Sequence, residues 1–504
     1  MIRNDLDSLP SYVPGKRNEN SLKLSSNESS FDPLPSVIAA IDKASKNINR
    51  YPDMAATALR TALASYLKLD FEQVAVGCGS SALCQQAVQI TAGIGDEVIF
   101  PWHSFEAYPI FIQIAGATAV PIPLTRDNKN DLQAMAAAIT KRTRLIFVCN
   151  PNNPTGTIVS KQDFLDFMAS VPKNVLVVLD EAYIEYVRDL DTPLASELVS
   201  RYENLIGLRT FSKAYGLAGL RVGYAFGNPR IIEALNKVAV PFSVSTLAQA
   251  AALASLSAPA RQELHTRTEQ TVAARELVAH VVGAAQSQAN FVWIPCTDAF
   301  DRAEYLSRKG ILTRAFNDGL RITVTTNKEA NMLIDAWNAD IINDFYTQAR
   351  ATNPQLPIET PQTWSFGSDH NHADELAALV AAGKKTATAS ALWDYEHDNE
   401  PLPELNELSI ITNGRSHPVA LIRTTNITIR RFCDIDEHFA YAEGEGDRSL
   451  EYWRKSHEDF WRRHMTDPRG FQTDMPVLCE EFEVIFNITD TNDNADISSL
   501  TPVE

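Results

Sequence analysis

The chain has 504 residues, too many for one ordinary hydrophobic core, so we expect two or three domains. With 45% hydrophobic and 21% charged residues, the composition is that of a soluble globular protein, and no apolar run is long enough to predict a membrane helix. The polar N-terminus lacks the apolar segment of a signal peptide, and six scattered cysteines form no CxxC pair, which predicts reduced thiols in a cytoplasmic protein.

The net charge of −18 is concentrated in the C-terminal part. From residue 355 onward, 12 Lys and Arg stand against 28 Asp and Glu, whereas the preceding residues hold 33 against 35. This shift predicts two domains, and the acidic balance argues against general nucleic-acid binding by the second. A stretch with three prolines, 348–364, has the composition of a linker. The predicted division is an enzyme domain at 1–350, a linker at 351–362, a second domain at 363–486 and a polar tail at 487–504.

The first domain alternates helical and strand-like segments. Residues 36–48 and 55–68 have helical apolar spacing, and six short apolar runs follow at 74–79, 96–101, 144–151, 174–183, 204–210 and 220–227. Such runs predict an α/β fold with a mostly parallel sheet covered by helices on both faces. Residues 229–281 read as helical and 290–337 as α+β. We therefore expect a large domain at about 35–250 and a small subdomain formed by about 1–34 and 251–350.

Polar residues follow several of these runs, at the strand ends where open α/β sheets bind ligands. "GCGSSA" (77–82) is a small-residue turn that opens a helix, which is typical of an anion site. Ser212 and Arg221 add a hydroxyl and a fork-shaped cation for the same anion. Asp180 ends an apolar run and is costly to desolvate without a cation. Lys213 could be simply that ion-pair partner.

A single cofactor would use all of these strand ends. Pyridoxal 5′-phosphate has a phosphate, a ring with polar substituents and an aldehyde that reacts with amines. In this interpretation Lys213 forms the Schiff base, and Asp180 pairs with the ring nitrogen. Tyr183 and Asn153 bind the 3′-oxygen of the ring. No single motif is specific for this cofactor, but the order of the motifs on consecutive strand ends favours it.

Residues from about 9 to 345 resemble the class I/II, fold-type I aminotransferases, in the histidinol-phosphate aminotransferase branch. The segments that carry the resemblance are "YVPG" (12–15), "KLSSNES" (23–29), "RYPD" (50–53), "GCGSSAL" (77–83), "NPNNPTG" (150–156), "DEAY" (180–183), "RTFSKAYGLAGLRVGY" (209–224), "SQANFVW" (287–293) and "LRITV" (320–324).

The resemblance implies further site residues. Tyr51 would reach the cofactor phosphate of the partner subunit, which implies a homodimer. Phe105 would stack on the cofactor ring, and Arg321 would hold the acidic end of the substrate. The remaining implied residues are Ser80 and Ser81 for the phosphate, and Arg314, Tyr12 and Asn27 for the substrate. From residue type alone, Tyr51 and Phe105 could equally be core aromatics, and Arg314 a salt-bridge residue.

The resemblance implies transamination of an aromatic amino acid with 2-oxoglutarate, since "SFEAYPI" and "FVCNPNNPTGT" look closest to aromatic aminotransferases. Histidinol phosphate is the alternative donor. Both donors carry a planar ring, and one or two arginines suit a carboxylate or a phosphate equally. A pyridoxal-dependent decarboxylase would use the same residues. "TVTT" (323–326) departs from the family, which usually has glycine before the last threonine.

Residues 363–486 resemble an ASCH domain, which is related to PUA-like β-barrels, through "GKKTAT", "EGEGDRSLEYW" and "VLCEEFEVI". We expect short strands with two helices. The resemblance implies an RNA or nucleoside ligand, with Lys385, Thr388 and Glu445 at the site. The alternative is that the lysine solvates a turn while Trp453, Phe460 and Trp461 fill a core. A regulatory role defined by this domain also stays open. "DHNH" (369–372) completes no ligand set, so we expect a polar loop and no metal.

Overall fold

The computed structural model describes residues 9, 18 and 20–487. Its contacts divide the chain into two compact units, Met1–Ala336 and Trp337–Glu504. The division falls inside helix α12 (Asn327–Thr352), whose last turn overlaps the start of the predicted linker at 351–362. Within the described residues, none of the helices is long and apolar enough to cross a membrane.

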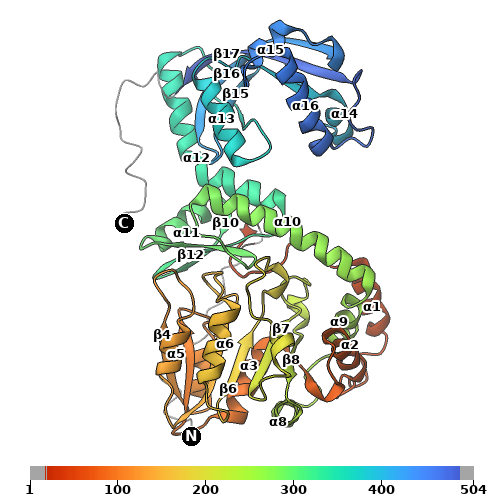
Figure 1. Ribbon diagram of the computed structural model, residues 1–504, viewed down its shortest axis with the longest axis vertical. Coiled ribbons are helices and arrows are strands. Elements are labelled where there is room, and N and C mark those ends of the chain that lie inside the picture. The colour runs from red at the N-terminus through yellow and green to blue at the C-terminus, as the bar shows by residue number, and fades with distance from the viewer. Residues whose placement is uncertain (1–8, 10–17, 19, 488–504) are drawn as a thin grey trace. The chain divides into compact units, whose positions relative to one another are not determined.

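The first unit is built around a seven-stranded sheet in the order β2-β8-β7-β6-β5-β3-β4 (Figure 1). β8 runs antiparallel to both of its neighbours, and the other pairs are parallel. The predicted α/β fold with a mostly parallel sheet is therefore confirmed. The strands are β2 (Val74–Gly77), β3 (Glu97–Trp102), β4 (Thr118–Pro123), β5 (Thr143–Cys149), β6 (Leu176–Asp180), β7 (Leu205–Thr210) and β8 (Gly223–Gly227).

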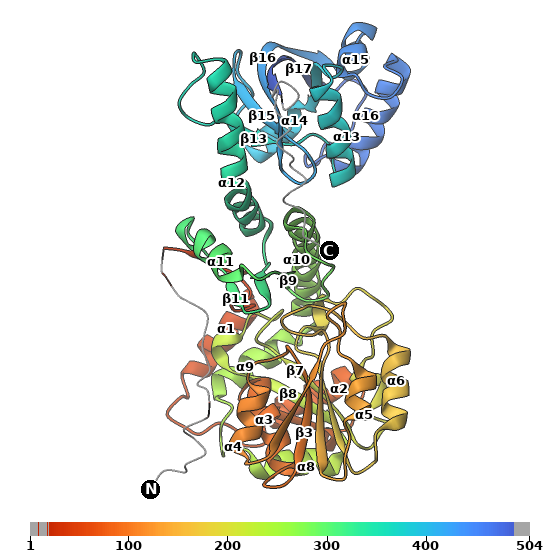
Figure 2. The ribbon, with the colours of Figure 1, turned by 90° about the vertical axis from the view of Figure 1, so that its left-hand side faces the viewer.

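Helices cover both faces of this sheet, which explains why its central strands are apolar throughout. Val178 of β6 faces a core with α3, α4 and α8, whereas Val177 faces the core on the other side, with α2, α5, α6 and α9. Figure 2 shows α3 and α4 on one side of the sheet and α5 and α6 on the other. The helices are α1 (Pro35–Ser45), α2 (Thr57–Leu67), α3 (Gly79–Thr91), α4 (Tyr108–Ile114), α5 (Leu132–Ala137), α6 (Lys161–Ser170), α7 (Ala195–Leu198), α8 (Pro229–Val238) and α9 (Thr246–Ser255).

Strand β4 was missing from the predicted strands. Its sequence, "TAVPIP", contains two prolines, which cannot donate to a sheet and are confined to edges. The strand lies at the edge, where Phe100 pairs with Pro121 and Trp102 with Pro123. Most of its residues are exposed and prolines interrupt its aliphatic side chains, so it lacks the buried, uninterrupted run that predicts the other strands.

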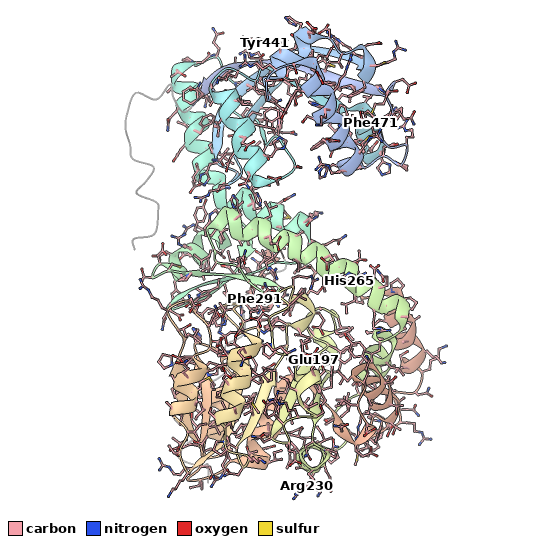
Figure 3. The ribbon with its side chains drawn as sticks, in the orientation of Figure 1. Glu197, Arg230, His265, Phe291, Tyr441 and Phe471 are labelled. Carbon is pink, nitrogen blue, oxygen red and sulfur yellow. The ribbon has the colours of Figure 1, made fainter. Side chains whose placement is uncertain are left out.

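A smaller α+β part of the first unit carries two arginines of the predicted site. Its three-stranded antiparallel sheet has the order β11-β12-β9, and Arg314 of β11 lies directly opposite Arg321 of β12. Phe291 of β9 (labelled in Figure 3) meets the ring of Tyr183 edge-on at 5.1 Å. The elements are β1 (Leu22–Lys23), which pairs with β10 (Ile311–Leu312), α10 (Ala258–Val282), β9 (Phe291–Pro295), α11 (Ala299–Arg308), β11 (Arg314–Phe316) and β12 (Gly319–Thr323).

The second unit contains a five-stranded sheet in the order β13-β15-β16-β17-β14. Register shifts between the long strands β16 and β17 indicate bulges, which bend and twist a sheet. Residues 363–486 contain four α-helices, so the expectation of two was wrong: the short helices α14 and α15 were missed. The expectation of short strands was wrong for β16 and β17, which have 14 and 12 residues. The unit also includes the part of α12 that follows Ala336. The elements are β13 (Gln362–Trp364), α13 (His370–Ala381), β14 (Ala387–Ala391), α14 (Leu392–Asp398), β15 (Leu408–Thr412), β16 (Pro418–Arg431), α15 (Glu437–Glu443), α16 (Leu450–His464) and β17 (Pro476–Asn487).

Aromatic side chains form one core of this unit. Trp453 and Trp461 of α16 are buried there, and Phe460 is half-buried against it. Phe432 packs between them and Phe471, which Figure 3 labels. The "DHNH" segment was expected to be a polar loop, and this expectation was wrong. Asp369 accepts a hydrogen bond from the backbone N–H of His372 at 3.0 Å, so these residues cap and begin α13.

Candidate active site and a second pocket

One cavity of about 500 Å³ in the first unit collects most of the predicted site residues. This volume is typical of a pocket for a small molecule. The predicted residues that line it are Asn27, Ser80, Ser81, Phe105, Asn153, Asp180, Tyr183, Ser212, Lys213, Arg221, Arg314 and Arg321. Tyr51 does not line it: this side chain is 82% exposed and stacks on Phe242. Tyr12 lies outside the described residues.

Lys213 follows β7 and places its amine in the cavity. Its Nζ donates a hydrogen bond to the backbone carbonyl of Ser26 at 3.2 Å. Burial lowers the pKa of Lys213 to about 7, and the positive charge of Arg321 adds to the effect. A lysine in this state is neutral for a large fraction of the time near neutral pH, which makes it a nucleophile and a base.

Asp180 ends β6 and is the buried carboxylate of the cavity. The hydroxyl of Tyr108 donates a hydrogen bond to Asp180 Oδ2 at 2.7 Å, whereas Oδ1 has no hydrogen-bond partner among the described residues. Burial raises the pKa of Asp180 to about 6, and the Tyr108 hydrogen bond opposes this rise. A buried oxygen without a partner is costly, so Oδ1 is suited to meet a donor on a ligand.

The N-terminus of α3 forms the anion-binding end of the cavity. Ser80 and Ser81 lie in its first turn, which holds no acidic residue to compete with an anion. Arg221 donates to Ser212 Oγ at 3.2 Å. Gly79 has a φ of +77°, and a Cβ there would collide with the Arg221 guanidinium, so glycine permits this close approach. Backbone amides, hydroxyls and a guanidinium together suit a phosphate group.

A hydrogen-bonded group of polar side chains also lines the cavity. Asn27 Nδ2 donates to the hydroxyl of Tyr183 at 3.0 Å. Arg321, which is 6% exposed, donates to Asn153 Oδ1 and to the backbone carbonyl of Ser25. Both of these acceptors are neutral, so neither of them compensates the positive charge of Arg321, which lines the cavity.

The sequence interpretation missed Glu106 and Thr210, which line the cavity, and Tyr108, which is buried against Asp180. Tyr108 lies three positions after Phe105, on the first turn of α4, where it resembles a core aromatic. Glu106, which lines the cavity, forms an ion pair with Arg314. Thr210 ends β7 beside Lys213. The sequence analysis gave a salt bridge as an alternative role for Arg314 but did not identify the acidic partner. No pattern in the sequence marks Glu106 as that partner.

The second unit holds a smaller pocket of about 90 Å³, lined by Lys385, Thr388 and Glu445. Lys385 Nζ donates at 2.7 Å to Glu445 and at 2.7 Å to Glu443, which also accepts from Trp453 Nε1 at 2.9 Å. Glu443 and His457 were not predicted. The sequence offers two glutamates around one glycine, and the structure shows that Glu443 is the more buried of them.

Charge in this second pocket is balanced within a buried group. Burial would lower the pKa of Lys385, but Glu443 and Glu445 raise it above its ordinary value. Burial would raise the pKa of Glu443, but Lys385 and His457 lower it. Lys385 is only 1% exposed, so the alternative in which it solvates a turn does not describe it.

We expect Lys385→Met to destabilise the protein. The substitution keeps the length of the side chain but leaves the buried carboxylate of Glu443 without its cation, which typically costs about 3–5 kcal/mol. Thermal and urea unfolding of the full chain measure the loss. Lys384→Met, at the exposed neighbouring lysine, is the matched control and should change little. Equal stability of the two variants would contradict the buried charge group.

Comparison with known proteins identifies both parts of the chain. Residues 19–336 match the family model "Aminotransferase class I and II", and residues 362–486 match "ASCH domain". An aromatic amino acid aminotransferase of Corynebacterium diphtheriae is 60% identical over 343 residues, which cover 67% of this chain and 99% of the relative. An aromatic amino acid aminotransferase of Mycobacterium marinum is 52% identical over 346 residues, which cover 66% of this chain and 95% of the relative. A histidinol-phosphate aminotransferase of Sinorhizobium meliloti, solved with pyridoxal-5′-phosphate, is 29% identical with a TM-score of 0.58, over 62% of this chain and 88% of that structure.

Proposed function

The chain belongs to the class I and II aminotransferases, and from this premise we propose that it transfers the amino group of an aromatic amino acid to 2-oxoglutarate. The observation that carries the proposal is the cavity in which Lys213 and Asp180 lie together with the anion-binding end of α3. The relatives from Corynebacterium and Mycobacterium act on aromatic amino acids by name, at 60% and 52% identity. The proposed donors are phenylalanine and tyrosine.

Pyridoxal 5′-phosphate is the cofactor, and the cavity residues fit it. The first turn of α3, Ser212 and Arg221 would hold the phosphate. Asp180 Oδ1, which has no partner among the described residues, would accept from the protonated ring nitrogen. Asn153 and Tyr183 would bind the 3′-oxygen, and Phe105 would stack on the ring. Lys213 would hold the cofactor covalently.

When bound, pyridoxal 5′-phosphate supplies an aldehyde carbon that joins amines and a ring that takes up the electron pair released at Cα. Once the amino group of the substrate has replaced it on the cofactor, Lys213 would be free to act as the base that removes the proton from Cα and delivers it to the former aldehyde carbon. Its lowered pKa keeps the Nζ lone pair available for this transfer. Asp180 stays ionised against the ring nitrogen and thereby stabilises the charge that the ring receives. Arg321 orients the substrate by its carboxylate.

We expect the reactivity of Lys213 with acetic anhydride to rise through about pH 7 in the cofactor-free protein. Only the neutral amine is nucleophilic, and the pKa of this amine is lowered to about 7 from 10.5. Peptide mass spectrometry measures the labelled fraction at each pH, with the exposed Lys173 as an internal reference for reagent decay. A labelling profile for Lys213 that rises only above about pH 9 would contradict the lowered pKa.

Formation of 2-oxo acids tests the proposed reaction. Phenylalanine, tyrosine and histidinol phosphate are offered separately as donors with 2-oxoglutarate, and each product is quantified by chromatography. Turnover of the two aromatic amino acids supports the proposal. Histidinol phosphate is the second candidate donor, because Arg314 places a further cation opposite Arg321. Turnover of histidinol phosphate alone would replace the aromatic donors, and carbon dioxide release would indicate a decarboxylase.

We also propose a cytoplasmic homodimer. Apolar side chains around Tyr51 are exposed in the single chain, which marks an interaction surface; they are Ile48 (68%), Tyr51 (82%), Met54 (67%), Val240 (70%) and Phe242 (40%). In a dimer Tyr51 would reach the cofactor phosphate of the partner. Sedimentation velocity should give the mass of two chains, and Tyr51→Asp should weaken both association and cofactor binding. The six free cysteines favour a reducing compartment, which cell fractionation checks.

For the ASCH domain we propose a nucleoside-sized ligand in the second pocket. Lys385, Thr388 and Glu445 supply polar groups, and Phe366, Phe460 and Trp461 supply aromatic walls on which a base can stack. The acidic balance of the domain does not suit a long RNA. Calorimetry with cytidine, N4-acetylcytidine and a short RNA distinguishes the ligands. If none of them binds at millimolar concentration, the proposal fails.

A further inference from the structure

An ion pair that lines the active-site cavity has no part in the proposed reaction. Arg314 Nη2 lies 3.1 and 3.0 Å from the two carboxylate oxygens of Glu106. The arginine side chain is 15% exposed and the glutamate 33%. Both line the cavity, Glu106 from the turn before α4 and Arg314 from β11. A substrate bound through Arg321 therefore has this ion pair as a neighbour.

The strand register explains why this pair matters for charge. Arg314 lies directly opposite Arg321 in the β11–β12 ladder, and like charges in opposite positions repel each other. Arg321 donates to neutral oxygens of Asn153 and Ser25, whereas Arg314 faces a carboxylate. The charge of Arg314 is thus compensated within the protein by Glu106. Without Glu106 this end of the cavity would be more positive by one charge, which suits a doubly charged anion.

We infer that Glu106 is a specificity-determining residue that favours donors with an uncharged side chain. Its carboxylate compensates the charge of Arg314 and repels a phosphate or a second carboxylate at this end of the cavity. Half-buried Ile110 and Phe111 line the cavity beside the pair and offer an apolar wall to a ring. The inference rests on the proposed function. It also means that the carboxylate of Glu106 repels the second carboxylate of 2-oxoglutarate and weakens the binding of this acceptor.

Two acids without an amino group test this inference without turnover. 3-Phenylpropanoate carries one carboxylate and a ring, and glutarate carries two carboxylates. Calorimetry with the cofactor-loaded full chain gives both dissociation constants for the wild type, Glu106→Gln, Glu106→Asp and the double variant Glu106→Gln/Arg314→Gln. In Glu106→Gln we expect glutarate to bind about tenfold tighter and 3-phenylpropanoate to change less than about twofold, because only the charge beside Arg314 is removed. The KM for 2-oxoglutarate should fall in parallel, and histidinol phosphate should gain in kcat/KM.

The other variants decide whether charge is the cause. Glu106→Asp keeps the carboxylate and should retain the wild-type preference, whereas the double variant has no arginine to release and should lose the glutarate gain. A gain for both acids, for neither, or one that persists in the double variant would overturn the inference. If the wild type neither binds 3-phenylpropanoate nor turns over phenylalanine, the proposed function fails as well. A wild type that turns over phenylalanine while Glu106→Gln leaves glutarate binding unchanged would overturn the role of Glu106 alone.

Discussion

Replacing Lys213 by alanine should abolish transamination and the visible absorbance of the bound cofactor together. The variant lacks the amine that would bond to the cofactor aldehyde and the base that moves the Cα proton, so we expect turnover to fall by about 10⁴-fold or more. The fold depends little on this lysine, because within the described residues its amine donates a single hydrogen bond, to the Ser26 carbonyl. Stopped-flow absorbance and oxo-acid assays measure the two losses.

Stability distinguishes a chemical role of Lys213 from a structural one. Its pKa is lowered from 10.5 to about 7, so folding disfavours the charged form, and stability from this group rises with pH across that window. Lys213→Ala removes this dependence and should melt no lower than the wild type at pH 7. Lys237→Ala, at an exposed lysine paired with Glu233, is the matched control and should keep full activity. A Lys213→Ala variant that retains absorbance and turnover would end the assignment.

The site residues at the ends of the buried strands were predictable because they are charged or polar and directly follow apolar segments. A carboxylate after "VLVVL" and a lysine after β7 have a high free-energy cost of burial in a sheet that is covered on both faces. Their presence therefore predicts a ligand that interacts with them. The parallel order of β5, β6 and β7 then brings Asn153, Asp180 and Lys213 to one edge. Local pattern and topology were sufficient for this part of the site.

The remainder of the site depends on pairings between distant segments, which no local pattern encodes. Glu106 meets Arg314 from 208 positions away, and Asn27 meets Tyr183 from 156 positions away. In the second unit, Glu443 and Glu445 are equivalent in sequence, and only the helix end at α15 decides which of them is buried against Lys385. Strand β4 could not be predicted from its own sequence either. Its prolines are compatible with a strand only at the edge of a sheet, and the position at the edge is set by the other strands.

Asp180→Asn should reduce kcat by about 10³-fold while leaving the cavity intact. The amide has the shape of the carboxylate, so it can still accept the Tyr108 hydrogen bond. It has no negative charge, and it turns an N–H toward the place where the ring nitrogen of the cofactor needs an acceptor. The loss therefore resembles the removal of a charge-stabilising group from a buried site. Tyr108→Phe keeps the charge and removes the hydrogen bond that lowers the pKa of Asp180, so its loss should be smaller, about tenfold.

The same substitution of Asp180 should make the cofactor-free protein less sensitive to pH. The pKa of Asp180 is raised from 3.8 to about 6 in the folded state, so the folded chain holds an extra proton between these values. Its stabilising contribution is present below pH 3.8 and is lost as the pH rises through about 6, by roughly 3 kcal/mol. Asp180→Asn removes this decline, and urea unfolding at pH 5 and pH 8 should show the variant gaining on the wild type at the higher pH. An unchanged pH dependence together with near-normal kcat would show that the carboxylate neither bears a buried charge nor supports the reaction. The combination of lower activity and higher stability is the expected mark of a charge that is buried for function.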